Sequence, residues 1–211
     1  YEEGQDYPIH CRRRGSLDAP EEIMVDANQL AEGHSYFALS GLTVSSDNQM
    51  IAFGIDTVGR RKYTIHFKDL TTGEILDRKI VDVTPNLAWA EDARVIFYTA
   101  KDPQTLRSYQ VWRHEVEGTS EDVLVYEETD ETFSCYVTKT KSREYLVIGS
   151  SQTLTTEHRF LRADDPHGDW KVFEPRERGH EYSIDHAAGR WVIRTNWDAR
   201  NFRLMEVAGN D

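Results

Sequence analysis

The sequence predicts an all-β protein, folded as a partial β-propeller of antiparallel four-stranded sheets. Three observations support this fold class: apolar and polar residues alternate in short runs, turn-forming residues separate the runs, and a weak repeat recurs every 44 to 51 residues. A spacing of about 40 to 50 residues is typical of a propeller blade, which cannot bury both faces alone and therefore stacks on its neighbours. The repeats align on Phe53, Phe97, Ile148 and Ile193.

Residues 1–39 precede the repeats, and we interpret them as a short lead-in segment. One helix is predicted inside it. Asp26 can cap its first turn, Gln29 follows three residues later as in a capping box, and Gly33 can end it. We expect this helix to have two turns at most.

From residue 40 onward the chain is predicted to form strands joined by hairpin turns. Residues 51–56 and 63–68 alternate apolar and polar side chains, as half-buried strands do. Turn-forming residues cluster at Thr71–Glu74, Glu117–Asp122 and Asp164–Asp169. Short strands separated by such turns indicate antiparallel hairpins.

Four repeat units fit into the rest of the chain, at residues 40–82, 83–129, 130–175 and 176–211. The last unit stops just after its last predicted strand, so we expect an incomplete fourth blade. A complete propeller usually has more blades than a chain of this length can supply. The sequence therefore predicts a truncated propeller, whose first and last blades would expose strand edges and apolar faces. Association into a homo-oligomer through those blade faces is the expected result.

Composition excludes several classes of protein. The formal net charge of −12 repels phosphate backbones and anionic headgroups, so nucleic acid and membrane surfaces are not expected partners. No apolar run approaches the roughly 18 residues that span a bilayer, and the first residues do not resemble a secretory signal. The two cysteines, Cys11 and Cys135, are predicted to be free thiols in a reducing, cytoplasmic compartment.

The motifs of common enzyme classes are missing. A hydrolase nucleophile of the α/β type needs G-x-S-x-G, because only small neighbours allow its tight turn. The nearest strings begin at Gly33 and Gly149 and lack the second glycine. Glycine-rich nucleotide fingerprints are also missing. We therefore predict no catalytic residue and no cofactor-binding residue in this chain.

The densest polar cluster is Arg176–His186, where His180, Glu181, Asp185 and His186 are candidate metal ligands. The two histidines are six residues apart within a predicted strand. At about 3.3 Å per residue they would lie about 20 Å apart, too far to share an ion. We interpret the cluster as the polar end of a blade strand and its turns, and predict no metal site.

Other polar and aromatic features have structural interpretations. Most of the tryptophans are expected to pack between blades rather than line a binding channel. The acidic run Glu127–Glu131 is interpreted as a solvated loop, and Asp56–Tyr63, with its basic pair, as a hairpin loop that an acidic partner could bind. The five tryptophans are Trp89, Trp112, Trp170, Trp191 and Trp197.

Longer strings carry a family resemblance. "EEGQDYPIHCRRRG", "DTVGRRKYTI", "FYTAKDPQTLRSYQVWRH", "VYEETDETF" and "IRTNWDARNF" resemble oligopeptidase B, or protease II, sequences of the prolyl oligopeptidase family of serine peptidases, and the likeness covers nearly the whole chain. The resemblance implies about four blades of a seven-bladed propeller. It also implies a separate α/β-hydrolase domain as partner, which carries the catalytic triad and cleaves short peptides after Arg or Lys.

Three hypotheses about function follow. In the first, which the resemblance favours, the chain is a non-catalytic domain that gates the access of short basic peptides to the hydrolase domain. In the second, it is a stand-alone propeller-like scaffold that binds a protein or peptide, although this would need a self-contained ring. In the third, the chain itself hydrolyses peptides, which would need a catalytic constellation that the sequence does not offer.

Overall fold

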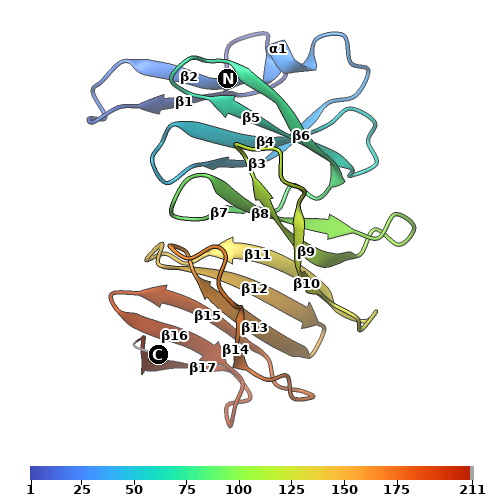
Figure 1. Ribbon diagram of the computed structural model, residues 1–211, viewed down its shortest axis with the longest axis vertical. Coiled ribbons are helices and arrows are strands. Elements are labelled where there is room, and N and C mark those ends of the chain that lie inside the picture. Colours follow the sequence, from blue (N-terminus) through green and yellow to red (C-terminus); the bar gives the residue numbers. More distant parts are fainter. Residues whose placement is uncertain (210–211) are drawn as a thin grey trace.

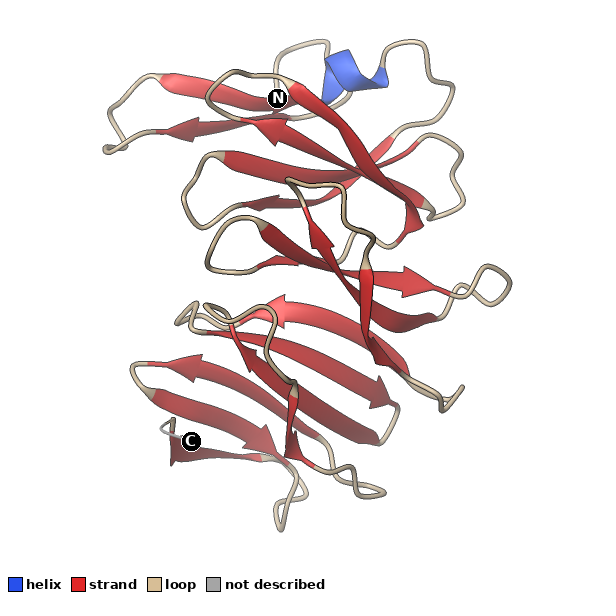
Figure 2. Ribbon diagram, in the orientation of Figure 1, coloured by secondary structure: helices blue, strands red, loops and turns tan. Residues whose placement is uncertain are grey.

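The computed structural model describes residues 1–209. Four antiparallel sheets follow one another in chain order after a two-stranded hairpin. Figure 1 shows the hairpin at one end of the stack and the last sheet at the other. Figure 2 shows the short helix beside the hairpin, among strands and loops. The predicted all-β class of antiparallel sheets is confirmed.

The sheets share one simple topology, in which each strand pairs with the next strand along the chain. The first sheet contains β3 (Ala38–Val44), β4 (Met50–Asp56), β5 (Tyr63–Asp69) and β6 (Ile75–Val83). The second contains β7 (Leu87–Trp89), β8 (Val95–Lys101), β9 (Ser108–Glu115) and β10 (Val123–Glu127). The third contains β11 (Ser134–Lys139), β12 (Tyr145–Gln152), β13 (Thr155–Arg162) and β14 (Lys171–Glu174). Within the described residues the last sheet has three strands, β15 (Tyr182–Ala187), β16 (Arg190–Thr195) and β17 (Arg203–Ala208).

The lead-in segment folds as the hairpin β1 (Ile9–Arg13) and β2 (Glu21–Asp26), followed by α1 (Ala27–Ala31). The carboxylate of Asp26 accepts hydrogen bonds from the backbone N–H groups of Asn28, at 2.9 Å, and Gln29, at 3.4 Å. These are among the N–H groups that a helix leaves unpaired at its start, so the side chain stabilises the first turn. The predicted short helix with its Asp26 cap is confirmed.

Apolar side chains from facing sheets meet at each junction of the stack. Phe67 of the first sheet contacts Trp89 of the second edge to face, with ring centroids 6.1 Å apart. The ring centroid of Tyr145, in the third sheet, lies 4.7 Å from that of Trp191, in the last sheet. Phe67 and Phe97 are fully buried, and truncating such a ring to alanine typically costs about 3–5 kcal/mol. The core is therefore a series of layers between sheets.

The outer face of the first sheet is covered. Val25 of β2 packs against Ile51 and Phe53 of β4, and all three side chains are buried. The ammonium group of Lys68 also donates to the backbone carbonyl of Met24 at 2.8 Å. The expectation that the first blade exposes its apolar face is therefore wrong, because the lead-in hairpin packs on it.

The only helix among the described residues has five residues, and none there is long and apolar enough to span a membrane.

Candidate functional site

Side chains from the preceding part of the stack bind the backbone of the first strand in the third and last sheets. The amide of Asn86, between the first and second sheets, donates to the carbonyl of Val137 at 2.9 Å and accepts from its N–H at 2.8 Å. The hydroxyl of Thr156 bridges the backbone N–H and carbonyl of Tyr182 in the same way, at 2.8 and 2.7 Å. These side chains satisfy backbone groups on the free edges of β11 and β15.

Replacing Asn86 is expected to loosen the junction of the second and third sheets. Asn86→Ala leaves the N–H and carbonyl of the buried Val137 without these partners, which costs about 1–3 kcal/mol. Urea unfolding followed by circular dichroism measures the loss. The exposed Asn201 is a matched control, and equal stability of Asn86→Ala and Asn201→Ala would contradict the bridging role.

A polar cluster joins the first three sheets at one end of their first strands. The ammonium group of Lys139 lies 2.6 Å from the Oε2 atom of Glu91 and 3.0 Å from the hydroxyl of Ser46. Arg143 donates to the backbone carbonyl of Ser46 at 3.1 Å. Ser46 follows β3, Glu91 follows β7 and Lys139 ends β11, so one cluster fixes three turns relative to one another.

A second and more buried cluster lies between the second and third sheets. The side chain of Glu128 is only 3% exposed, and its Oε2 atom lies 2.6 Å from a guanidinium nitrogen of Arg176. Tyr126 donates its hydroxyl to the same carboxylate at 2.7 Å, and Ser150 donates to it as well. Arg176 also pairs with Glu157 at 3.3 Å. The guanidinium thus links the segment after β14 to β13 and to the end of β10.

The pKa values in this region follow from burial and hydrogen bonding. Burial alone would raise the pKa of Glu128, but hydrogen bonds from Arg176, Ser150 and Tyr126 outweigh it and lower this pKa to about 2. Burial, together with the bond to Glu128, raises the pKa of Tyr126 to about 12. Burial lowers the pKa of His158 to about 4. At neutral pH the carboxyl group of Glu128 is therefore charged, and the imidazole of His158 is neutral.

The four candidate metal ligands do not share one site. His180 lies just before β15 rather than within it, and its Nε2 atom is 2.9 Å from the hydroxyl of Thr195. Asp185 accepts from the backbone N–H of Lys141. His186 contacts Ser142, and the backbone N–H of Glu181 donates to Asn196. Each of these residues is engaged at a different contact between turns and strands.

One contact superficially resembles part of a catalytic triad. The Nδ1 atom of His186 lies 2.8 Å from the hydroxyl of Ser142 and 3.5 Å from a carboxylate oxygen of Glu144. In a triad the hydroxyl and the carboxylate bind opposite nitrogens of the imidazole, so that a proton can pass across the ring. Here both face one nitrogen, and His186 is 1% exposed. This arrangement connects the turn between β11 and β12 to strand β15.

The serines nearest to a nucleophile motif are also unsuitable. Ser35 lies in the exposed loop after α1. Ser150 is fully buried and donates to Glu128, and Ser151 follows it in β12. None lies on a turn from a strand into a helix, where the nucleophile of an α/β-hydrolase is found.

The tryptophans pack mostly as predicted. Trp89 and Trp191 are buried between sheets, and Trp112 and Trp170 pack against the cores. Trp197 differs, because it is 48% exposed. It lies with Phe173, Tyr182 and Met205 in an apolar groove of about 300 Å³ between the third and last sheets.

Of the two charged runs, Asp56–Tyr63 and Glu127–Glu131, only the first has the structure expected from the sequence. The Asp56–Tyr63 run forms the predicted hairpin loop, in which the buried carboxylate of Asp56 accepts from the N–H groups of Val58, Gly59 and Arg61. The interpretation of Glu127–Glu131 as a solvated loop is wrong for Glu128. Its partner Arg176 is 48 residues away, and no local pattern in the sequence announces the pair.

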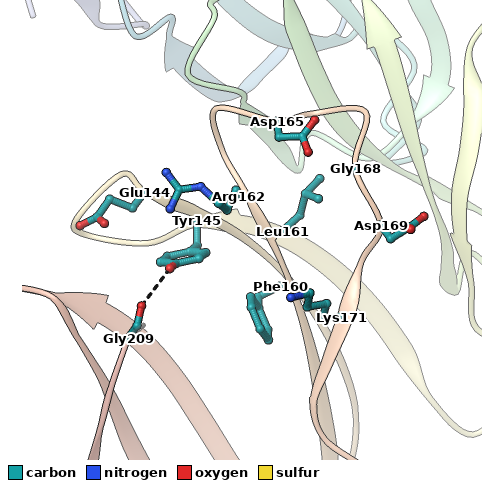
Figure 3. Close-up of a pocket in the computed structure, with 10 residues that line it drawn as sticks. All are labelled: Glu144, Tyr145, Phe160, Leu161, Arg162, Asp165, Gly168, Asp169, Lys171 and Gly209. Carbon is teal, nitrogen blue, oxygen red and sulfur yellow. Dashed lines mark hydrogen bonds between the residues drawn. The ribbon is translucent and has the colours of Figure 1, made fainter. Parts of the chain in front are cut away.

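Figure 3 shows a larger hollow of about 580 Å³ beside the third sheet. Among the residues that line it, Tyr145 donates its hydroxyl to the carbonyl of Gly209 at 3.3 Å. The hollow has charges of both signs, so it has no marked preference for an anion or a cation. Its lining residues are Glu144, Tyr145, Phe160, Leu161, Arg162, Asp165, Gly168, Asp169, Lys171 and Gly209.

Comparison with known proteins gives one consistent result. The family model described as "Prolyl oligopeptidase, N-terminal beta-propeller domain" matches residues 1–211. The chain is 41% identical to dipeptidyl aminopeptidase BI of Pseudoxanthomonas mexicana, covering 96% of this chain and 30% of that protein. It is 31% identical to Protease 2 of Moraxella lacunata, covering 100% of this chain and 31% of that protein.

Solved structures agree with the sequence relatives. Oligopeptidase B from Leishmania major superposes with a TM-score of 0.87 at 30% identity, over 98% of this chain and 30% of that one. Oligopeptidase B from Trypanosoma brucei, closed form with covalently bound antipain, gives 0.86 at 28% identity, over 97% of this chain and 30% of that one. The chain thus spans about 30% of the length of these proteins. The predicted partial propeller is confirmed, and the chain belongs to the prolyl oligopeptidase family, as its N-terminal β-propeller domain.

Proposed function

We propose that the chain is the non-catalytic propeller domain of a serine peptidase, and that it controls which peptides reach a separate hydrolase domain. The observation that carries this proposal is the match of the whole chain to the family's N-terminal propeller domain, over only about 30% of the relatives' length. Catalysis then resides outside the chain, in the partner hydrolase domain. We further propose that residues 1–39 connect the two domains and that the blades begin near residue 40.

The contacts at the blade junctions would make such a propeller domain rigid. Lys139 and Glu91 tie turns of neighbouring sheets together, and Glu128 and Arg176 do so at a buried junction. Ion pairs and close-packed rings between sheets resist opening, since separating them would expose buried charge and apolar surface together. A rigid propeller domain would exclude folded proteins from the hydrolase domain and admit short, flexible peptides.

The bond that is cleaved has two candidates. Resemblance to oligopeptidase B favours cleavage after Arg or Lys inside short peptides by the intact enzyme. The relative at 41% identity is named a dipeptidyl aminopeptidase, a name that denotes release of dipeptides from a free amino terminus. This identity exceeds the 31% to Protease 2, so removal of dipeptides is the second candidate.

The test uses two chromogenic amides of Arg-Arg, one with a free amino terminus and one with a blocked terminus. The purified chain is assayed alone and with a separately produced hydrolase domain. We expect no turnover by the chain alone and changed turnover or peptide selectivity in the mixture. Hydrolysis of the blocked substrate indicates cleavage after Arg, and hydrolysis of only the free one indicates dipeptide release. Turnover by the chain alone, stopped by a serine-directed reagent, would contradict the proposal.

A further inference from the structure

A polar hollow of about 340 Å³ lies where the first strands of three consecutive sheets meet. Residues of β3, β7 and β11 line it, together with residues of the turns that follow β3 and β11. All three sheets have four strands, and neither end of the chain takes part in forming the hollow. Its shape is therefore set by contacts among the first three sheets.

The charged residues that line the hollow are of one sign. They are Lys139 and Arg143, both cationic, in a chain whose formal net charge is −12. Glu91, beside the hollow, pairs with both, because its carboxylate oxygens lie 2.6 Å from the ammonium nitrogen of Lys139 and 3.6 Å from a guanidinium nitrogen of Arg143. The other carboxylates of the first two turns, Asp47 and Asp92, accept hydrogen bonds from backbone N–H groups of their own turns. Two cations thus share one carboxylate, and the hollow presents positive charge.

Both cations retain N–H donors that these contacts do not use. The side chain of Arg143 is 54% exposed, and a single guanidinium nitrogen makes its contacts with Glu91 and, at 3.1 Å, with the carbonyl of Ser46. The ammonium group of Lys139 contacts Glu91 and the hydroxyl of Ser46, which occupies two of its three donors. A guanidinium has five N–H donors and can bind both oxygens of a carboxylate side by side. The hollow therefore suits a carboxylate ligand.

The backbone of β11 adds donors and acceptors for an extended ligand. This strand pairs with β12 on one side only, and alternate residues of such a strand turn their N–H and carbonyl groups away from the partner. The N–H and carbonyl of Val137 bind the side chain of Asn86, so they point away from β12. Lys139, two residues later in the same strand, has the same orientation. A peptide whose carboxylate binds Arg143 can therefore add hydrogen bonds to the backbone of Lys139, as in strand addition.

We propose that this hollow binds the C-terminal carboxylate of a short peptide, with Arg143 and Lys139 as its cationic ligands. The inference deepens the proposed function and rests on it for the choice of a peptide, since a carboxylate can also come from a small free acid. A short peptide carries its terminal carboxylate within a few residues of any of its bonds. A site for that group would let the propeller domain recognise short peptides by their chain end.

The experiment is an NMR titration of the isotope-labelled chain at constant ionic strength. The three probes are N-acetyl-trialanine as the free acid, the same peptide as its C-terminal amide, and sodium acetate. We expect the free acid to shift the backbone amide signals of Lys139 and Arg143. The amide lacks the charge and acetate lacks the peptide backbone, so we expect each to bind at least about tenfold more weakly.

Two variants change the site in opposite directions. Arg143→Gln removes the more exposed cation, and we expect at least about tenfold weaker binding of the free acid. Glu91→Gln removes the carboxylate that competes for both cations, so we expect tighter binding. The matched control is Arg162→Gln, which makes the same charge change at a side chain that is 56% exposed and also paired with an exposed carboxylate, that of Asp164. We expect it to bind like the native chain.

Binding of the free acid that Arg143→Gln weakens and Glu91→Gln strengthens supports the proposal. Equal binding of acid and amide overturns it, and so does no binding of the acid at about 20 mM. Acetate that binds as tightly as the peptide overturns the choice of a peptide as ligand. Unchanged binding in Arg143→Gln also overturns the proposal, because the peptide then uses another surface. The titration contains no hydrolase domain, so its failure is distinguishable from failure of the proposed function, which the turnover of the Arg-Arg amides tests.

Discussion

Arg176→Met is expected to lower the free energy of unfolding by about 3–5 kcal/mol, the typical cost of breaking a buried ion pair on one side. The carboxylate of Glu128 is 3% exposed and lies 2.6 Å from the guanidinium that the substitution removes. The arginine also stacks over the ring of Phe133, with its guanidinium carbon 4.1 Å from the ring centroid. Methionine keeps much of that packing, so the loss mainly reports the uncompensated charge. Urea unfolding measures it.

The matched control is Arg162→Met. Arg162 pairs with Asp164 at 2.7 Å, but both side chains are more than half exposed. Exposed pairs contribute about 0–1 kcal/mol, because water solvates the charges nearly as well. Similar losses for the two variants would contradict the view that burial of Glu128 makes the Arg176 pair important.

The pH dependence provides a second measurement of the same pair. The pKa of Glu128 falls from the ordinary 4.5 to about 2 in the folded chain. A group with a lowered folded pKa contributes stability above its unfolded pKa, and this stability is lost as pH falls through the folded value. The difference between the native chain and Arg176→Met is therefore expected to be full at neutral pH and to shrink between about pH 4.5 and pH 2. A difference that stays constant over this window would show that the ion pair does not carry the effect.

The sequence predicts features that depend on local patterns. Period-two alternation identifies strands such as β4 and β5, and Asp26 with the residues that follow it identifies the helix start, because those signals lie within a few residues. The repeat spacing identifies stacked sheets. The same reasoning fails for Glu128, which sits in an acidic run that looks solvated. Its burial depends on Arg176 and Ser150, 48 and 22 residues away, and composition does not encode such contacts.

The placement of the lead-in shows the same limit. Val25 in β2 alternates like any edge-strand residue, and nothing near it in the sequence indicates that it covers Ile51 and Phe53. The junction residues Asn86 and Thr156 are also unremarkable locally. Asn86 forms hydrogen bonds with Val137 in β11, and Thr156 forms them with Tyr182 in β15. The contacts that join one blade to the next therefore depend on how strands of different sheets are placed in the tertiary structure, which the local sequence pattern does not indicate.

Gly41→Ala is expected to be the most damaging single methyl addition at the junction of the first two sheets. Gly41 adopts φ +68°, where an L side chain is strained, and it lies at the irregularity in the pairing of β3 with β4. A Cβ atom there would overlap the backbone carbonyl oxygen of Pro85 and lie 2.9 Å from its carbonyl carbon. Because backbone cannot rotate away as a side chain can, either β3 or the segment entering β7 must shift. We expect a loss of about 3 kcal/mol or more.

Gly73→Ala separates the two causes of this loss. Gly73 has a similar positive φ of +80°, but no atom lies within 4 Å of its added Cβ. Its substitution therefore reports the backbone strain alone, about 1 kcal/mol. The excess loss in Gly41→Ala, measured by urea unfolding, reports the contact with Pro85. If the two variants lose equal stability, the close approach of β3 to the second sheet is not what requires glycine at residue 41. A clearly larger loss of stability in Gly41→Ala would instead show that the first two blades are held at a separation that leaves no room for one methyl group, as a rigid propeller domain requires.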